Sequence, residues 1–170
     1  MRLDLDMLQQ MHPRLNATNA AELCHRAAVG LERHGHESSV PMATELDGSH
    51  HDCALTWTAA EISAALQLDR HQVTEWAAEA ISLAVVNVGL GWAVARRGQR
   101  GDSCDWWLKD RNGDLAALEV SGIDSGDTAR RLRDKVVQVQ QAPGAMHRAA
   151  CVVELASPKT DLVTVAARSA

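Results

Sequence analysis

The segment from Asp105 to Ser121 constrains this chain most. Two short runs rich in apolar residues flank the turn residues Arg111-Asn112-Gly113, a pattern typical of a β-hairpin. Asp105 precedes the first run, and Glu119 lies within the second. Because side chains alternate between the two faces of a strand, the register of this hairpin decides whether the two carboxylates share a face.

Two registers are open. A two-residue turn at Asn112-Gly113 would point the two carboxylates to opposite faces. A three-residue loop closed by Gly113 in the left-handed conformation would pair Asp110 with Asp114 and set the carboxylates directly opposite each other. The second register is favoured, since the first places Glu119 among core residues, where an unpaired charge is costly. One face would then carry Trp106, Leu108, Ala116, Leu118 and Val120, and the other Asp105, Trp107, Ala117, Glu119 and Ser121.

Directly opposite residues on paired strands have Cβ atoms roughly 5 Å apart, and like charges there repel each other. The favoured register therefore predicts that a divalent metal, a basic neighbour or a shared proton accompanies the two carboxylates.

The remaining pattern predicts an α/β fold with a mixed β-sheet flanked by helices, in the order α-β-β-β-α-β-β. Helical spacing of apolar residues predicts long helices over 70–88 and 127–141, and a capping box predicts a shorter one over 58–66. Residues 1–56 are expected to form a loop-rich N-terminal segment with a short helix near 20–31, and residues 57–170 the α/β domain. The expected strands are 92–97, the two arms of the hairpin, 150–155 and 162–167.

Composition limits the partners of the chain. The formal net charge of -5 argues against a protein that holds nucleic acid by its whole surface, but it permits a local basic groove. We expect DNA or RNA to meet such a groove through Arg96, Arg97, Arg100, Arg131 and Lys135.

Cysteine usage and hydropathy indicate a cytoplasmic protein. The four cysteines show no Cys-x-x-Cys spacing, and no charged-then-apolar signal segment opens the chain. The longest apolar run, 77–88, is interrupted by polar residues and is too short to span a bilayer, so no membrane role is expected.

A helix bearing an acidic residue, a strand, two strands carrying Asp and Glu, and a helix with basic residues together resemble the PD-(D/E)xK nuclease superfamily over roughly residues 70–155. The resemblance implies that Asp105 and Glu119 bind Mg²⁺ or Mn²⁺, with the Val120 carbonyl as a third ligand. Glu79 corresponds to the acidic residue often found on the first helix of that superfamily. Oxygen ligands of this kind suit hard cations.

The chain departs from the superfamily pattern at two positions. Ser121 stands where the motif lysine is expected, and Cys104 replaces the proline before the aspartate. A neutral hydroxyl does not stabilise a developing hydroxide as an ammonium group does. Either Lys135 or Arg131 reaches into the site from the following helix, or the site binds without cutting.

Three functions follow from these patterns. The first is a metal-dependent nucleic-acid phosphodiesterase using Glu79, Asp105, Glu119, Ser121 and Lys135. The alternative is a non-catalytic interaction module on a degenerate nuclease-like fold, bound to a protein partner or to a second copy of itself. The third is a zinc-stabilised regulatory domain, although its ligands lack the usual close spacing. Those ligands would be Cys24, His25, His34, His36, His50, His51 and Cys53.

Overall fold

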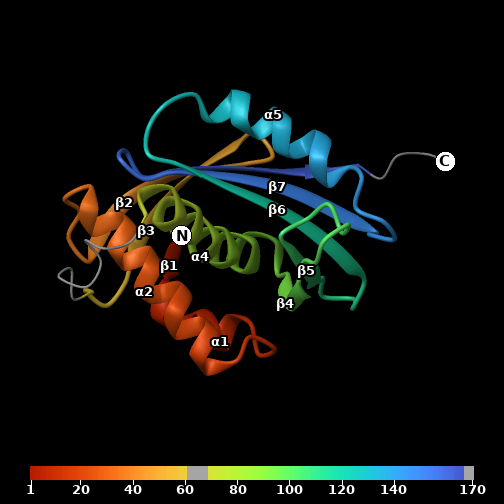
Figure 1. Ribbon diagram of the computed structural model, residues 1–170, viewed down its shortest axis with the longest axis horizontal. Helices are drawn as coiled ribbons and strands as arrows, with labels where there is room; N and C mark the ends of the chain where they lie inside the picture. The colour runs from red at the N-terminus through yellow and green to blue at the C-terminus, as the bar shows by residue number, and fades with distance from the viewer. Residues whose placement is uncertain (61–68, 167–170) are drawn as a thin grey trace.

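A mixed β-sheet with helices on both faces forms the protein (Figure 1). The structure, a computed structural model, describes residues 1–60 and 69–166. The helices are η1 (Leu5–Met7, a 3-10 helix), α1 (Leu8–Met11), α2 (Ala17–Arg33), α4 (Arg70–Leu90) and α5 (Thr128–Val139). The strands are β1 (Arg2–Asp4), β2 (Ser39–Leu46), β3 (Ser49–Thr56), β4 (Ala93–Arg97), β5 (Trp106–Lys109), β6 (Leu115–Ile123), β7 (His147–Glu154) and β8 (Lys159–Val165).

The described strands form one sheet in the order β1-β3-β2-β8-β7-β6-β5-β4. Strands β4, β5 and β6 pair antiparallel, whereas β6 and β7 pair in parallel. A parallel pair needs a long crossover connection, and α5 supplies it. The predicted class, an α/β fold with a mixed sheet flanked by helices, is confirmed.

The helices divide between the two faces of the sheet. Helix α4 packs against β6 and β7 on one face, and α2 packs against α4 (Figure 1). Helix α5 covers β6 and β7 on the other face. Each face therefore has its own apolar cluster, the larger one under α4 and the smaller one under α5.

Residues 1–56 form much more regular structure than the loop-rich segment that the sequence predicts. They supply β1, β2, β3 and the 17-residue helix α2, and all three strands belong to the central sheet. The hairpin of β2 and β3 turns at Asp47-Gly48, and both turn residues have positive φ, at 49° and 78°. An Asp-Gly pair is a strong hairpin signal when alternating apolar and polar residues flank it. Here that alternation is hard to see, because the side chains on the outward face of both strands are mostly polar or small.

The two helices that flank the candidate site begin and end within two residues of the predicted bounds. Asp69 caps α4 by accepting a hydrogen bond from the Gln72 amide at 3.1 Å, and Gly91 ends the helix with a left-handed φ of 73°. Asp127 caps α5 in the same way through the Arg130 amide at 3.0 Å. The helix expected over 58–66 falls largely on residues 61–68, outside the described residues.

Helix α4 is longer than the apolar run that the sequence suggested. It has 21 residues, and among the described helices it is the one long and apolar enough to cross a membrane. About 67% of its most apolar 18-residue stretch is buried inside the fold, between α2 and the sheet. Such burial is typical of a helix in a protein core.

Candidate active site

The hairpin adopts the three-residue loop, which places Glu119 on the predicted face, and Asp105, the residue before β5, lies close to it. Trp107 pairs with Ala117, and this register continues to the turn, where the Asp110 amide donates to the Asp114 carbonyl at 3.0 Å. Gly113 closes the loop with a φ of 89°. The predicted sorting of the two faces is therefore also correct.

The carboxylate-bearing face is not open to solvent, because α5 lies over it. Trp107 and Ala117 belong to the apolar cluster under this helix. Beyond them on the same face, Glu119 is 1% exposed and Ser121 is fully buried. The site therefore holds a carboxylate in a poorly solvated place, where its charge depends on its immediate neighbours.

A basic neighbour accompanies Glu119, as the repulsion argument requires. The Lys135 ammonium, on α5, donates to Glu119 Oε1 at 2.6 Å. Burial and the negative charge of Asp105 nevertheless raise the pKa of Glu119 to about 7, against the lowering effect of Lys135. The second oxygen, Glu119 Oε2, is buried and has no hydrogen-bond partner among the described residues. Asp105 turns its Oδ2 toward the Val120 amide, which donates to it at 2.8 Å.

Ser121 lies in a chain of hydrogen bonds between the two helices. Arg131 Nε on α5 donates to Ser121 Oγ at 2.8 Å, and Ser121 Oγ donates to Glu75 Oε1 at 3.3 Å. The Gly122 amide donates to Glu75 Oε2 at 3.0 Å. Both Lys135 and Arg131 thus reach this face of β6 from α5, which is one of the alternatives that the sequence left open.

Glu75 is a site residue that the sequence analysis did not single out. It lies one helical turn before Glu79 on α4, so both project from the same side of the helix. That spacing was a usable signal, but paired glutamates on a helix are ordinarily a solvated flank. The contact with Ser121 depends on how α4 sits against the sheet, which no local pattern describes.

Glu79 is buried beside the hairpin but is paired with a different residue. Its Oε1 accepts a hydrogen bond from Arg97 Nη2 at 2.6 Å, and its Oε2 has no hydrogen-bond partner in the described part of the chain. Burial raises the pKa of Glu79, opposed by Arg97 and reinforced by the charges of Asp105 and Glu75. Glu79 thus belongs electrostatically to the same acidic group.

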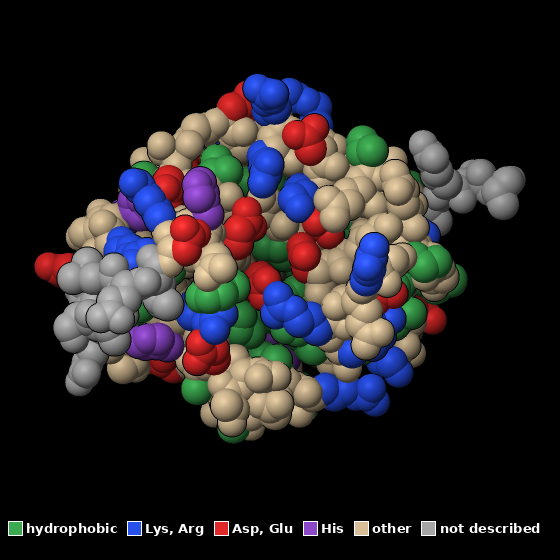
Figure 2. Space-filling view, in the orientation of Figure 1, with side chains coloured by type: hydrophobic (Ala, Val, Ile, Leu, Met, Phe, Trp, Pro, Cys, Tyr) green, Lys and Arg blue, Asp and Glu red, His purple; other side chains and the backbone are tan. Residues whose placement is uncertain are grey.

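Basic side chains surround these acids. Figure 2 shows Asp and Glu side chains near the middle of one face of the molecule, with Lys and Arg side chains around them. The basic residues expected to form a groove fall into two groups. Arg131 and Lys135 contact the hairpin. Arg97 instead binds Glu79, and Arg96 binds Asp102 at 2.6 Å. Arg100 is exposed in the loop between β4 and β5.

Gly122 allows α4 to approach the candidate site closely. A Cβ at this position would overlap the Thr74 carbonyl oxygen, a backbone atom. We therefore expect Gly122→Ala to lower the free energy of unfolding by about 1–3 kcal/mol, as overpacking does. Urea denaturation measures this, with Gly89→Ala in α4 as the matched control, since a Cβ there meets the end of the Leu46 side chain. Equal stability of the two variants would contradict the close approach.

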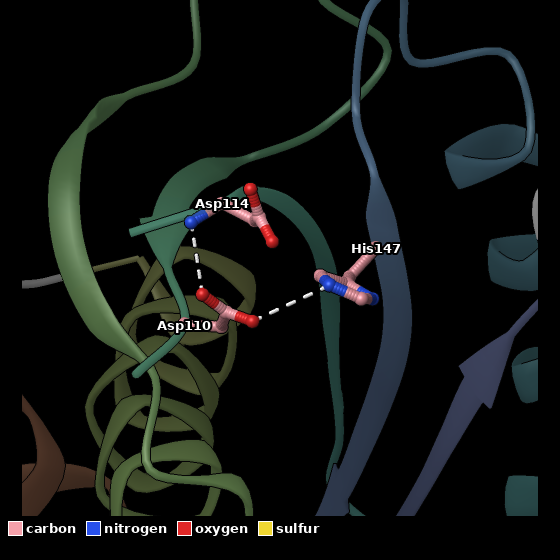
Figure 3. Close-up of side chains that lie close together, drawn as sticks. All are labelled: Asp110, Asp114 and His147. Atoms are coloured by element: carbon pink, nitrogen blue, oxygen red, sulfur yellow. Dashed lines mark hydrogen bonds and ion pairs between the residues drawn. The ribbon is translucent and has the colours of Figure 1, made fainter. Parts of the chain in front are cut away.

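A second cluster of potential metal ligands lies at the tip of the hairpin. Within the described residues, side-chain atoms of Asp110, Asp114 and His147 lie within 4.8 Å of one another (Figure 3). Asp110 Oδ1 accepts hydrogen bonds from the Asn112 and Asp114 amides, both at 2.8 Å, and Asp110 Oδ2 lies 3.4 Å from His147 Nε2. These contacts account for Asp110 as a residue that closes the turn.

Several of the residues considered for zinc have separate partners. His34 contacts Asp124 at 3.2 Å, and His36 contacts the Leu155 carbonyl at 2.8 Å. His50 contacts Glu45 and Asp52, and the Cys24 thiol donates to the Leu5 carbonyl. Within the described residues, none of the seven belongs to a group of side chains placed to hold a metal ion.

Comparisons with protein-family models, with curated proteins and with solved structures found no match to this chain. The relation to the PD-(D/E)xK superfamily therefore stays a prediction from the sequence motif.

Proposed function

We propose that this protein is a divergent metal-dependent nucleic-acid phosphodiesterase in which Asp105 and Glu119 hold Mg²⁺ or Mn²⁺. One observation carries the proposal: the hairpin brings Asp105 close to Glu119, under a helix whose Lys135 ammonium contacts Glu119. The order α4, β4, β5, β6, α5, β7 agrees with the element order that the superfamily resemblance implies.

The side chains present suit a hard divalent cation. Asp105 and Glu119 offer carboxylate oxygens, and Glu119 Oε2 is buried without a hydrogen bond among the described residues. A buried oxygen left without a donor is costly unless a ligand satisfies it. The Val120 carbonyl is the third ligand that the resemblance implies. A bound cation of this kind would polarise a phosphate oxygen and lower the pKa of a coordinated water.

Lys135 takes the role for which Ser121 is unsuited. Its ammonium lies 2.6 Å from Glu119 Oε1, although it projects from α5 rather than from the strand position of the motif. A positive charge there would stabilise a developing hydroxide in a site with little water. Ser121 instead positions the Arg131 guanidinium, which also lies 3.7 Å from Glu75. Glu75 and Glu79 then adjust the charge around the two carboxylates.

The test is cleavage of single-stranded and duplex DNA and RNA in the presence of Mg²⁺ or Mn²⁺. We expect Asp105→Asn and Glu119→Gln each to reduce the cleavage rate by about 100-fold or more. Lys135→Gln should reduce the cleavage rate by about 10²–10⁴-fold, as the loss of a proton-transfer group does. Asp114→Asn is the matched control, because Asp114 is an exposed carboxylate on the same hairpin. Cleavage that survives the Asp105→Asn, Glu119→Gln double substitution would refute the proposal.

A second function is favoured by a specific observation. The Lys135 ammonium already neutralises Glu119 without a metal, as in a nuclease-like fold that has become an interaction module. Such a module would bind a protein partner or a second copy of the chain. Titration calorimetry with Mg²⁺ and Mn²⁺ separates the two functions, since the module predicts neither metal binding nor cleavage.

We further propose a cytoplasmic location for the protein. All four cysteines are free thiols, and burial raises the pKa of the Cys104 and Cys151 thiols to about 12. Free thiols are the usual state in a reducing compartment.

A further inference from the structure

A hollow beside the acidic group is lined by arginine and tryptophan side chains from distant parts of the chain. It has a volume of about 330 Å³ and lies between α2, α4, β4 and β5. Glu79 belongs to its wall, so the hollow adjoins the proposed site. The arginines and tryptophans that line it are Arg14, Arg26, Arg96, Arg97, Trp76 and Trp106.

The charge of this hollow is opposite to that of the whole chain. Four arginines line it against two glutamates, whereas the protein has a formal net charge of -5. Arg96 and Arg97 hold carboxylates but keep side-chain exposures of 49% and 56%. Arg14 is exposed and makes no hydrogen bond or ion pair within the described residues. Anionic groups would therefore be drawn to this hollow rather than to the surface at large.

The hollow also contains a flat surface held in place before any ligand arrives. The Arg26 guanidinium lies over the Trp76 ring, 3.3 Å from its centroid. Glu22, one turn earlier on α2, accepts a hydrogen bond from Arg26 Nε at 2.6 Å. Two contacts thus fix a guanidinium plane whose side chain is 26% exposed. Little conformational entropy remains to be lost when another flat group stacks on it.

We infer that this hollow binds one nucleotide of a single-stranded nucleic acid, next to the carboxylates of the proposed phosphodiesterase. The base stacks on the Arg26 plane supported by Trp76, and adjacent phosphates contact Arg14, Arg96 and Arg97. Bases stack on guanidinium planes when they are unpaired, and a duplex keeps its bases out of reach. The inference rests on the proposed function and names its substrate class.

Binding without metal tests this inference apart from cleavage. Fluorescence anisotropy in EDTA compares a labelled oligothymidylate, an abasic oligomer of equal length and a duplex. We expect the wild-type protein to bind the oligothymidylate roughly tenfold more tightly than the abasic oligomer, as one stacked base provides. Trp76→Leu should abolish that preference, and Trp76→Phe should retain most of it, since an aromatic ring still supports Arg26.

A charge reversal tests the phosphate contacts. Arg14→Glu should weaken binding of both oligomers several-fold and reduce the salt dependence of binding. Arg133→Glu is the matched control, because Arg133 is also exposed and makes no described contact but lies on α5, away from the hollow. It should leave affinity nearly unchanged. Thermal unfolding of each variant verifies that it is folded.

The outcomes separate this inference from the proposed function. Absence of binding in EDTA, equal affinity for the oligothymidylate and the abasic oligomer, or equal effects of Arg14→Glu and Arg133→Glu would overturn the inference. Cleavage by a protein whose Trp76 and Arg14 variants bind normally would support the phosphodiesterase but overturn this inference. The predicted binding pattern in a protein that does not cleave would support the inference and refute the phosphodiesterase.

Discussion

At about pH 8, replacing Lys135 with methionine is expected to lower the free energy of unfolding by about 3–5 kcal/mol, the usual cost of removing one partner of a buried ion pair. Lys135 has a side-chain exposure of 17% and Glu119 of 1%, so the remaining carboxylate would lie beside Asp105 with no compensating charge. Urea denaturation with a constant m-value measures the difference.

The matched variant for this prediction is Lys135→Met combined with Glu119→Gln. Removing the carboxylate charge should recover most of the lost stability, because a neutral pair leaves no buried charge without a partner. The cost of Lys135→Met alone should also shrink near about pH 5, where Glu119, whose pKa burial has already raised to about 7, takes up a proton. A cost that is equal at both pH values, and that the second substitution does not relieve, would contradict a buried ion pair.

The second large effect concerns His12, which is fully buried after α1. The Val94 amide donates to His12 Nδ1 at 3.1 Å, so Nδ1 carries no proton and Nε2 donates to the Leu83 carbonyl, also at 3.1 Å. A second proton would have to sit on Nδ1, where it would point at the N–H group of Val94, which is itself a donor. Burial, partly offset by the Leu83 contact, lowers the pKa of His12 from 6.5 to about 4.

This difference makes the stability of the protein depend on pH. Between about pH 4 and 6.5 the unfolded chain binds a proton at His12 that the folded protein excludes, so stability falls as the pH falls through this range. The total change is about 3 kcal/mol at 1.36 kcal/mol per pKa unit. Glu119 contributes in the opposite direction, so the measurement is the difference in unfolding free energy between wild type and His12→Gln. A difference that does not change between the two pH limits would contradict the neutral buried ring.

Local chemistry made the hairpin predictable. Gly113 supplies the left-handed residue that a three-residue loop needs, and alternation then assigns every side chain from Asp105 to Ser121 to a face. The starts of α4 and α5 were predictable for the same reason, since Asp69 and Asp127 bind amides within their own first turns. Such interactions span a few residues and need no partner from elsewhere.

The N-terminal strands and the acidic partners were not predictable in this way. Strand β2 pairs with β8, whose residues follow it by more than 100 positions, and no local signal announces that pairing. Glu75 contacts Ser121 because α4 lies close to β6, and Arg26 meets Trp76 because α2 packs on α4. The sequence shows each of these residues, but it does not show that they lie close together in the fold.

The sequence alone determined which carboxylates of the hairpin share a face, since that depends on the period of a strand and the geometry of one turn. Only the tertiary structure decided that Glu119 is covered by α5, receives Lys135 and lies beside Asp105, and that the charges of Asp105 and Glu75 act on Glu79. The physical reason is that burial and Coulomb interactions act through space, so the charge state of a site depends on groups far away along the chain.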